Sequence, residues 1–168
     1  MRYMLTGDLS TDWNRDPYLV IADNSDPLNI SFVKRFKLAG DCGTFLCDSR
    51  RLYCLEREFF EVFDIEDFGK IRLLKRIEGY NGGHLLLNEN SNLLYLSNWR
   101  RGIAIIDLSN RDDPIPLGTA DCDCIDPVPE GNDGPYGIAD GLCLRGKYLF
   151  GVSMDYNPVK EYRSAVCV

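Results

Sequence analysis

The sequence contains a single histidine and no long apolar run. No stretch reaches the roughly 18 apolar residues that a membrane helix needs, and the first ten residues, MRYMLTGDLS, lack the apolar core of a signal peptide. Cations are in the minority, with 19 Lys and Arg against 26 Asp and Glu, for a net charge of -7. We therefore expect a soluble chain without membrane insertion, and no nucleic-acid partner, because its average surface potential repels phosphate.

Zinc-type cysteine patterns are also missing. The seven cysteines form an odd set without two C-x2-C pairs or a histidine cluster, which argues against a structural zinc site. Cys54 in LYCL and Cys143 in GLCLRG lie in apolar segments, where we expect a thiol to act as a small buried hydrophobe. A reducing compartment is the simpler interpretation, so a cytoplasmic location is favoured. An extracellular or cell-envelope location is the alternative if the N-terminus is truncated.

Helical periodicity is hard to find in this chain. Apolar residues come in short runs separated by Gly, Asn, Asp and Pro, a pattern that is typical of strands. Many short strands with no helix between them favour an antiparallel all-β fold over a parallel sheet with crossovers. The predicted strands are 1–5, 18–22, 30–38, 43–47, 51–55, 59–64, 71–77, 84–87, 93–97, 103–107, 136–144, 148–153 and 163–168.

The predicted strands repeat along the chain. One strand in each unit ends in an aspartate, at Asp23, Asp64 and Asp107, and the spacings are 41 and 43 residues. A second landmark supports the period, because Leu52 opens LYCL and Leu93 opens LLYL, 41 positions later. Polar residues follow each aspartate, and a further strand comes next, the weakest being IPLGTA. We expect the three aspartates to form turns rather than to act in catalysis.

Four short strands in about 42 residues are typical of a β-propeller blade, whose small sheet buries its apolar face against its neighbours. We predict one repeat domain over residues 1–168, with units of about 1–42, 43–82, 83–135 and 136–168. The length suits a ring of about four antiparallel blades or, slightly preferred, an arc of a larger propeller. The arc is preferred because the chain opens at a blade's second strand and ends at a third. Its open faces and edges favour self-association.

One segment resembles a known propeller repeat. GIAIIDLSNRDDPIPLGTA, residues 102–120, is similar to the LVIVD-type repeat, in which an apolar strand ends in Asp and is followed by Ser-Asn, a Pro and a later Gly. YLVIADNSDPLNISFV and FEVFDIEDFGKIRLL carry looser forms of the same pattern. The resemblance implies a propeller scaffold, often part of a larger protein, with no shared catalytic residues to transfer. Such a fold does not by itself define a function.

His84 is a weak candidate for a catalytic residue. It opens a predicted inner strand in NGGHLLLN, near where the channel of a propeller would lie. Together with loop carboxylates such as Asp121 and Asp140, it would suit a hydrolase or lyase that uses this channel. The alternative is a structural histidine held by hydrogen bonds, since no second histidine or nucleophile accompanies it.

The long loop 121–135 concentrates carboxylates. Asp121, Asp123 and Asp126 are weak candidates for a metal site, because carboxylate oxygens are the ligands that Ca²⁺ prefers. Their spacing does not match an EF-hand loop, so a solvated acidic loop without a cofactor is the alternative.

Two predicted loops combine tryptophan with arginine. Trp99, Arg100 and Arg101 follow one strand, and Trp13 occupies the corresponding loop of the first unit. Because Trp and Arg are enriched at binding hot spots, we predict a shared binding surface there, although Trp99 packed on a neighbouring sheet is the alternative. The predicted function is a non-catalytic scaffold that binds a protein partner, its own copies or another ligand. The alternatives are the His84 enzyme and a purely structural segment of a longer repeat protein.

Overall fold

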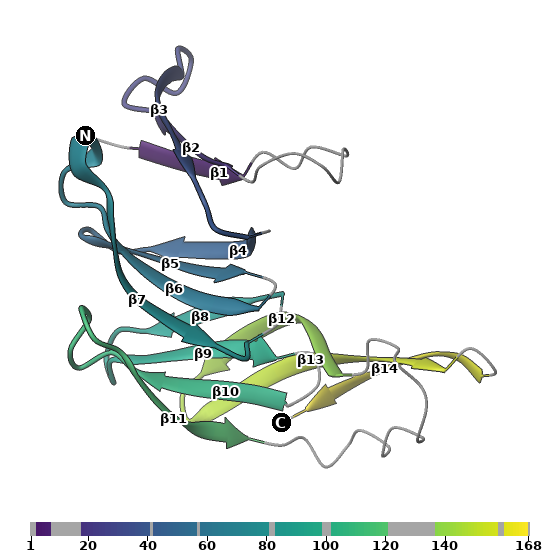
Figure 1. Cartoon of the computed structure of the whole chain (residues 1–168). Helices are drawn as coiled ribbons and strands as arrows, with labels where there is room; N and C mark the ends of the chain where they lie inside the picture. Colours follow the sequence, from purple (N-terminus) through teal and green to yellow (C-terminus); the bar gives the residue numbers. More distant parts are fainter. Residues whose placement is uncertain are drawn as a thin grey trace.

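The computed structural model describes residues 3–7, 18–40, 42–56, 58–80, 83–98, 102–120, 137–157 and 160–167. These residues form strands, arranged in four antiparallel sheets, and one short 3-10 helix (Figure 1). The all-β prediction is confirmed. Among the same residues no helix has the length and apolar character needed to cross a bilayer.

Each sheet is a meander, in which strands that are consecutive in sequence pair with one another. The first sheet contains β1 (Tyr3–Gly7), β2 (Tyr18–Asp23) and β3 (Ser31–Lys37). The second contains β4 (Cys42–Cys47), β5 (Arg51–Glu56), β6 (Phe59–Asp64) and β7 (Arg72–Glu78), with the 3-10 helix η1 (Phe68–Lys70) between β6 and β7. The third contains β8 (Leu85–Asn88), β9 (Leu93–Asn98), β10 (Gly102–Asp107) and β11 (Ile115–Ala120). The fourth contains β12 (Gly137–Arg145), β13 (Tyr148–Asn157) and β14 (Lys160–Cys167).

The sheets follow one another in chain order: the first, second and third lie from the top of Figure 1 to the bottom, and the fourth lies beside the third. The part of the chain that is described does not close into a barrel or a ring. Between the first and second sheets the buried apolar residues are Leu19, Leu38, Leu52, Cys54, Phe63 and Ile65. Between the second and third sheets they are Tyr53, Leu55, Phe60, Val62, Leu85, Leu94, Leu96, Ala104, Ile106 and Leu108. Between the third and fourth sheets they are Ile103 and Leu142.

The three repeated aspartates form the predicted turns. In each case the carboxylate accepts a hydrogen bond from the backbone N–H of the residue two positions later, which is an Asx turn. These bonds run from Ser25, Glu66 and Ser109 to Oδ1 of Asp23, Asp64 and Asp107, at 2.8, 3.1 and 2.8 Å. Hydrogen bonds from the same following residues are the largest cause of a pKa below the ordinary value at all three carboxyls. The turn prediction is confirmed.

The register corrects the spacing of one landmark. Leu52 pairs with the residue before Asp64, and Leu94 pairs with the residue before Asp107. Leu52 therefore corresponds to Leu94, 42 positions later, and not to Leu93 as predicted. The difference matters because side chains alternate along a strand, so a slip of one residue would turn a core leucine to the opposite face.

Two further predictions concern the weak strand IPLGTA and the burial of Cys54 and Cys143. The weak strand predicted at IPLGTA is β11, and a bulge at Leu117, opposite Ile105 and Ile106 of the partner strand, accommodates its Pro and Gly. Cys54 is buried as expected, but the prediction for Cys143 is wrong, because its side chain is exposed. Its neighbour Leu142 faces the core toward the third sheet, so alternation turns Cys143 the other way.

Candidate functional site

Most of the predicted site residues lie outside the described residues: Trp13, Trp99, Arg100, Arg101, Asp121, Asp123 and Asp126. Asp140 lies in the first part of β12, residues 137–140, of which only the backbone is described. His84 is therefore the predicted site residue whose side-chain contacts can be followed. The binding and Ca²⁺ predictions for the other positions stay predictions.

His84 lies just before β8 and joins two sheets. Its backbone N–H donates to Ser97 Oγ at 2.8 Å, and its carbonyl accepts from the Ser97 N–H at 3.0 Å, within the third sheet. Its ring Nδ1 accepts a hydrogen bond from the backbone N–H of Leu142 in the fourth sheet, at 3.3 Å. A ring nitrogen that accepts carries no proton, so this contact places the ring proton on Nε2.

The surroundings of His84 favour a structural role for it. Among the residues that the structure describes, no carboxylate forms a hydrogen bond or ion pair with the ring. Those same residues include no group of three or more His, Cys, Asp or Glu side chains placed to hold a metal ion. A general base accepts a proton on an unprotonated ring nitrogen. In His84 that nitrogen is Nδ1, and it already accepts the hydrogen bond that joins the two sheets.

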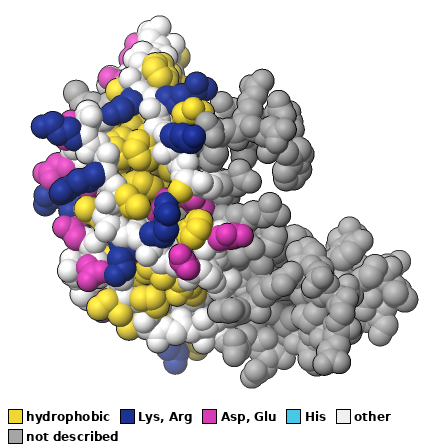
Figure 2. Space-filling view, viewed as in Figure 1, with side chains coloured by type: hydrophobic (Ala, Val, Ile, Leu, Met, Phe, Trp, Pro, Cys, Tyr) yellow, Lys and Arg dark blue, Asp and Glu magenta, His cyan; other side chains and the backbone are white. Residues whose placement is uncertain are grey.

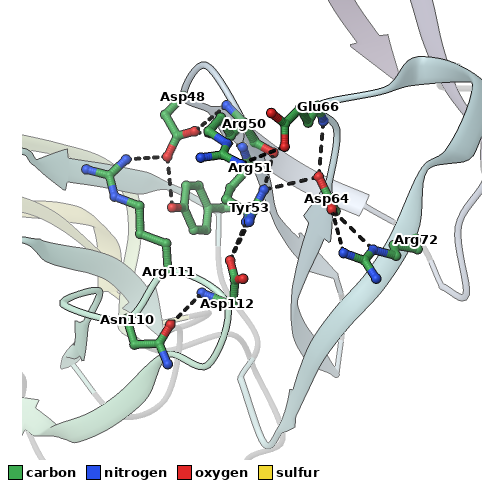
Figure 3. A network of polar contacts seen from close by, with 10 residues as sticks. All are labelled: Asp48, Arg50, Arg51, Tyr53, Asp64, Glu66, Arg72, Asn110, Arg111 and Asp112. Atoms are coloured by element: carbon green, nitrogen blue, oxygen red, sulfur yellow. Dashed lines mark hydrogen bonds and ion pairs between the residues drawn. The ribbon is translucent and has the colours of Figure 1, made fainter.

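Figure 3 shows a network of polar contacts where the turns of the second and third sheets meet. Asp48, in the turn between β4 and β5, accepts from the backbone N–H groups of Arg50 and Arg51 at 2.7 and 2.8 Å. Its other carboxylate oxygen accepts from the Tyr53 hydroxyl at 3.0 Å and pairs with the guanidinium of Arg111, from the loop between β10 and β11. Asp48 thereby organises its own turn and also joins the two sheets.

Arg51 extends the network, and its side chain is only 9% exposed. Its Nε and Nη2 contact Asp112 Oδ1 of the third sheet at 2.7 and 2.5 Å. Its Nη1 donates to Asp64 Oδ1 at 3.1 Å, and Arg72 of β7 donates to the other oxygen of Asp64 at 3.0 and 3.1 Å. A buried arginine thus has carboxylates on both sides, which satisfies its charge at the sheet boundary.

The electrostatics of this network suit a structural link between the second and third sheets. Burial is the largest influence on Asp48 and would raise its pKa, but hydrogen bonds from Arg50, Arg51, Arg111 and Tyr53 together bring that pKa below its ordinary value. Burial, assisted by the negative charge of Asp48, raises the pKa of the Tyr53 phenol. Near neutral pH the carboxyl therefore stays ionised and the phenol stays protonated. Neither group is poised for proton transfer, which works best with a pKa near the operating pH.

Sequence reasoning missed this network. Asp-Ser-Arg after a strand indicates a turn, but Arg111 lies 63 positions from Asp48, and Asp112 lies 61 positions from Arg51. Only the stacking of the two sheets brings these side chains together. No local pattern in the sequence could have paired them.

The outer strands and the loops before them expose apolar side chains. Figure 2 shows apolar side chains along this face of the molecule, interspersed with Lys and Arg. Exposed apolar area of this kind often marks an interaction site. On the first three sheets these residues are Leu28, Ile30, Phe32, Val33, Leu73, Ile115 and Leu117.

No protein-family model matches the chain, and no curated protein sequence matches it. What the protein does is therefore inferred from its residues and their contacts.

Proposed function

We propose that the chain is a non-catalytic β-propeller repeat module of the LVIVD type that acts as a scaffold for binding a protein partner. Three successive sheets carry the same strand, aspartate and Asx turn, and neighbouring sheets share apolar cores. This repeated unit supports a blade-like architecture, because each small sheet obtains its core from its neighbours.

The observation that carries the proposal is how the polar side chains between sheets are used. Asp48 and Arg51 bind partners across the boundary of the second and third sheets, and His84 binds across the next boundary. Catalytic groups are normally directed at a substrate and tuned for proton transfer. The use of these groups to join sheets favours the scaffold over a hydrolase or lyase built on His84.

A second observation supports protein binding. Phe32, 68% exposed, and Leu28, 90% exposed, lie together on and before the outer strand of the first sheet. Leu73 on β7 and Leu117 on β11 extend the exposed apolar surface to the next two sheets. Such a surface gains free energy when a partner covers it. The loops that carry Trp13 and Trp99 are the predicted centres of recognition.

The test uses a double variant, Trp99→Ala with Arg101→Ala. The tagged chain captures a partner, the partner is identified and purified, and Kd is measured with both purified proteins. We expect the double variant to raise Kd at least about tenfold, as loss of an interface hot spot does, with an unchanged Tm. Lys70→Ala, at an exposed cation outside both loops, is the control and leaves Kd unchanged. An unchanged Kd in the double variant contradicts the proposal.

The enzyme alternative has its own test. The purified chain is incubated with chromogenic ester and glycoside substrates, with His84→Gln in parallel. The scaffold proposal expects equal, background rates for both proteins. Turnover above background that His84→Gln abolishes would establish the enzyme instead.

A further inference from the structure

Neighbouring sheets in this chain meet through two different faces. We call the face toward the next sheet in sequence the following face, and the face toward the previous sheet the preceding face. Phe36 on the following face of the first sheet packs edge-on against Phe63 on the preceding face of the second, with ring centroids 5.3 Å apart. The second and third sheets, and the third and fourth, meet in the same order. Every internal contact is therefore heterologous, following face on preceding face.

The first sheet has an apolar preceding face. Residues that pair directly across an antiparallel ladder lie on the same face, so Phe32 shares a face with its partner Ala22, and Arg35 shares one with Val20. This face points away from the second sheet, because Leu19, at the alternate position of β2, packs toward it. Phe32 is 68% exposed there.

The preceding face of the second sheet is built in the same way and is covered. Arg76 lies over the ring of Phe59 at 4.8 Å, just as Arg35 lies over the ring of Tyr18 at 4.5 Å in the first sheet. Arg76 also pairs with Glu61, at 0% exposure, on the side that packs against the first sheet. The second sheet uses this arrangement of an arginine over an aromatic ring where the first sheet packs on it. The first sheet has the same arrangement on its preceding face, and no described sheet packs there.

The fourth sheet presents the complementary face. Leu142 and Leu149 pack toward the third sheet, so the alternate residues Cys143 and Tyr148 lie on the following face. Cys143 is exposed and Tyr148 is 50% exposed. Phe150 pairs directly with Cys143 and shares this face. No sheet of the described part of the chain packs on it.

We propose that the chain self-associates head to tail, with the following face of the fourth sheet in one copy packed on the preceding face of the first sheet in a second copy. The same two kinds of face meet at each of the internal boundaries, and each copy carries one of each. A sheet of the same repeat is therefore the occupant that the geometry specifies. A heterologous contact closes into a ring if its rotation permits and otherwise continues as an open chain.

The charges on the two faces favour an apolar contact over an ionic one. Arg35 and Lys37 share the face of Tyr18 and Val20 in the first sheet, and Arg145 pairs directly with Tyr148 in the fourth. Both faces thus carry cations, so the contact rests on apolar burial and not on pairs of opposite charge between the faces. Because salt weakens charge attraction and does not weaken apolar burial, raising the salt from about 0.05 to about 0.5 M leaves the association unchanged or tightens it. An association that this salt dissociates is driven by charge and contradicts the proposal.

The experiment measures the mass of the purified chain by analytical ultracentrifugation up to about 100 μM, a range that detects Kd values near 10 μM. We expect the wild-type mass to rise above one chain with concentration. Phe32→Asp and Tyr148→Asp each place a charge on one of the two faces and raise Kd at least about tenfold. Leu117→Asp, at a 59% exposed residue on β11, is the matched control and leaves the mass unchanged.

Mixing the two variants identifies the contact as heterologous. Phe32→Asp keeps an intact fourth sheet, and Tyr148→Asp keeps an intact first sheet, so the mixture forms a dimer through the one undamaged pair of faces. A monomeric wild type, or a mixture that stays monomeric, overturns the proposal. Should Phe32→Asp fail to fold, Phe32→Ser replaces it. Self-association is measured on the purified chain alone, and partner binding at concentrations where the chain is monomeric, so the two proposals fail separately.

Discussion

The joint between the second and third sheets and the joint between the third and fourth sheets connect similar units by different means. The first joint buries ten residues in one core and adds ion pairs from Asp48 to Arg111 and from Arg51 to Asp112. In the described residues, the second joint buries Ile103 and Leu142 and adds a hydrogen bond to His84. A repeat fold is a sum of local units and interfaces, so its stability need not be uniform along the chain.

The largest effect that separates the two joints comes from a matched pair of core substitutions. Leu96→Ala at the second–third joint is expected to lower the free energy of unfolding by about 3–5 kcal/mol, because its closely packed site cannot collapse around the cavity. Leu142→Ala at the third–fourth joint is expected to cost about 2 kcal/mol, since its small cluster can relax. Urea denaturation measures both. Equal losses would mean that the two joints are equivalent.

The ionic part of the second–third joint is tested with Asp48→Ala. Loss of this carboxylate leaves Arg111 and Tyr53 without an acceptor that they share, and we expect a cost of about 2–3 kcal/mol at pH 7 by urea denaturation. Asp113→Ala is the control, since its ion pair with Lys75 is largely exposed and is worth about 0.5 kcal/mol. A cost at Asp48 no greater than at Asp113 would contradict a fastening role.

The same residue predicts a dependence on pH. The pKa of Asp48 is below its ordinary value in the folded protein, so the stability it contributes is present above the unfolded pKa of about 3.9. That stability is lost as the pH falls through the lower, folded pKa. Stability measured from pH 7 to pH 2 should therefore fall less steeply below about pH 4 in Asp48→Ala than in the wild type. Parallel curves for the two proteins would show that Asp48 is not involved.

The repeated turn aspartates should differ in how much they contribute to stability, because one of them, Asp64, also belongs to the ionic network of the second–third joint. Asp64 binds Arg51 and Arg72 in addition to its Asx turn, whereas Asp107 makes the turn contact with Ser109. Asp64→Ala should therefore lower Tm more than Asp107→Ala does. A thermal melt of each variant decides this. If the two variants have the same Tm, the additional ion pairs contribute nothing to stability.

The smallest effect is expected at the weaker joint. His84→Ala removes the acceptor of the Leu142 N–H, which should cost about 1 kcal/mol and open the joint locally. Hydrogen exchange of the Leu142 amide should become about fivefold faster, while exchange at Leu96 stays unchanged. Faster exchange at both amides would indicate global destabilisation. No change at Leu142 would show that His84 does not stabilise the joint.

Much of the fold is predictable from local sequence, and little of the site is. The strands follow from apolar runs between turn formers, and β11 is the weakest of these signals because Pro116 and Gly118 reduce its strand character. The turn role of Asp23 and Asp107 was evident from the residues that follow them. Cys143 was assigned to the core because its segment is apolar, yet alternation along β12 turns its side chain outward.

The amino-acid sequence by itself determined that the chain is all-β and repeats a strand that ends in an Asx turn, because these features depend on neighbouring residues. Tertiary structure alone decided that Arg111 reaches Asp48, that Arg51 lies buried between Asp64 and Asp112, and that His84 joins two sheets. The bonds from Asp48 to Arg111, from Arg51 to Asp112 and from His84 to Leu142 each link different sheets and residues about 60 positions apart in sequence. Their formation depends on how one sheet stacks on the next, which local propensity does not specify.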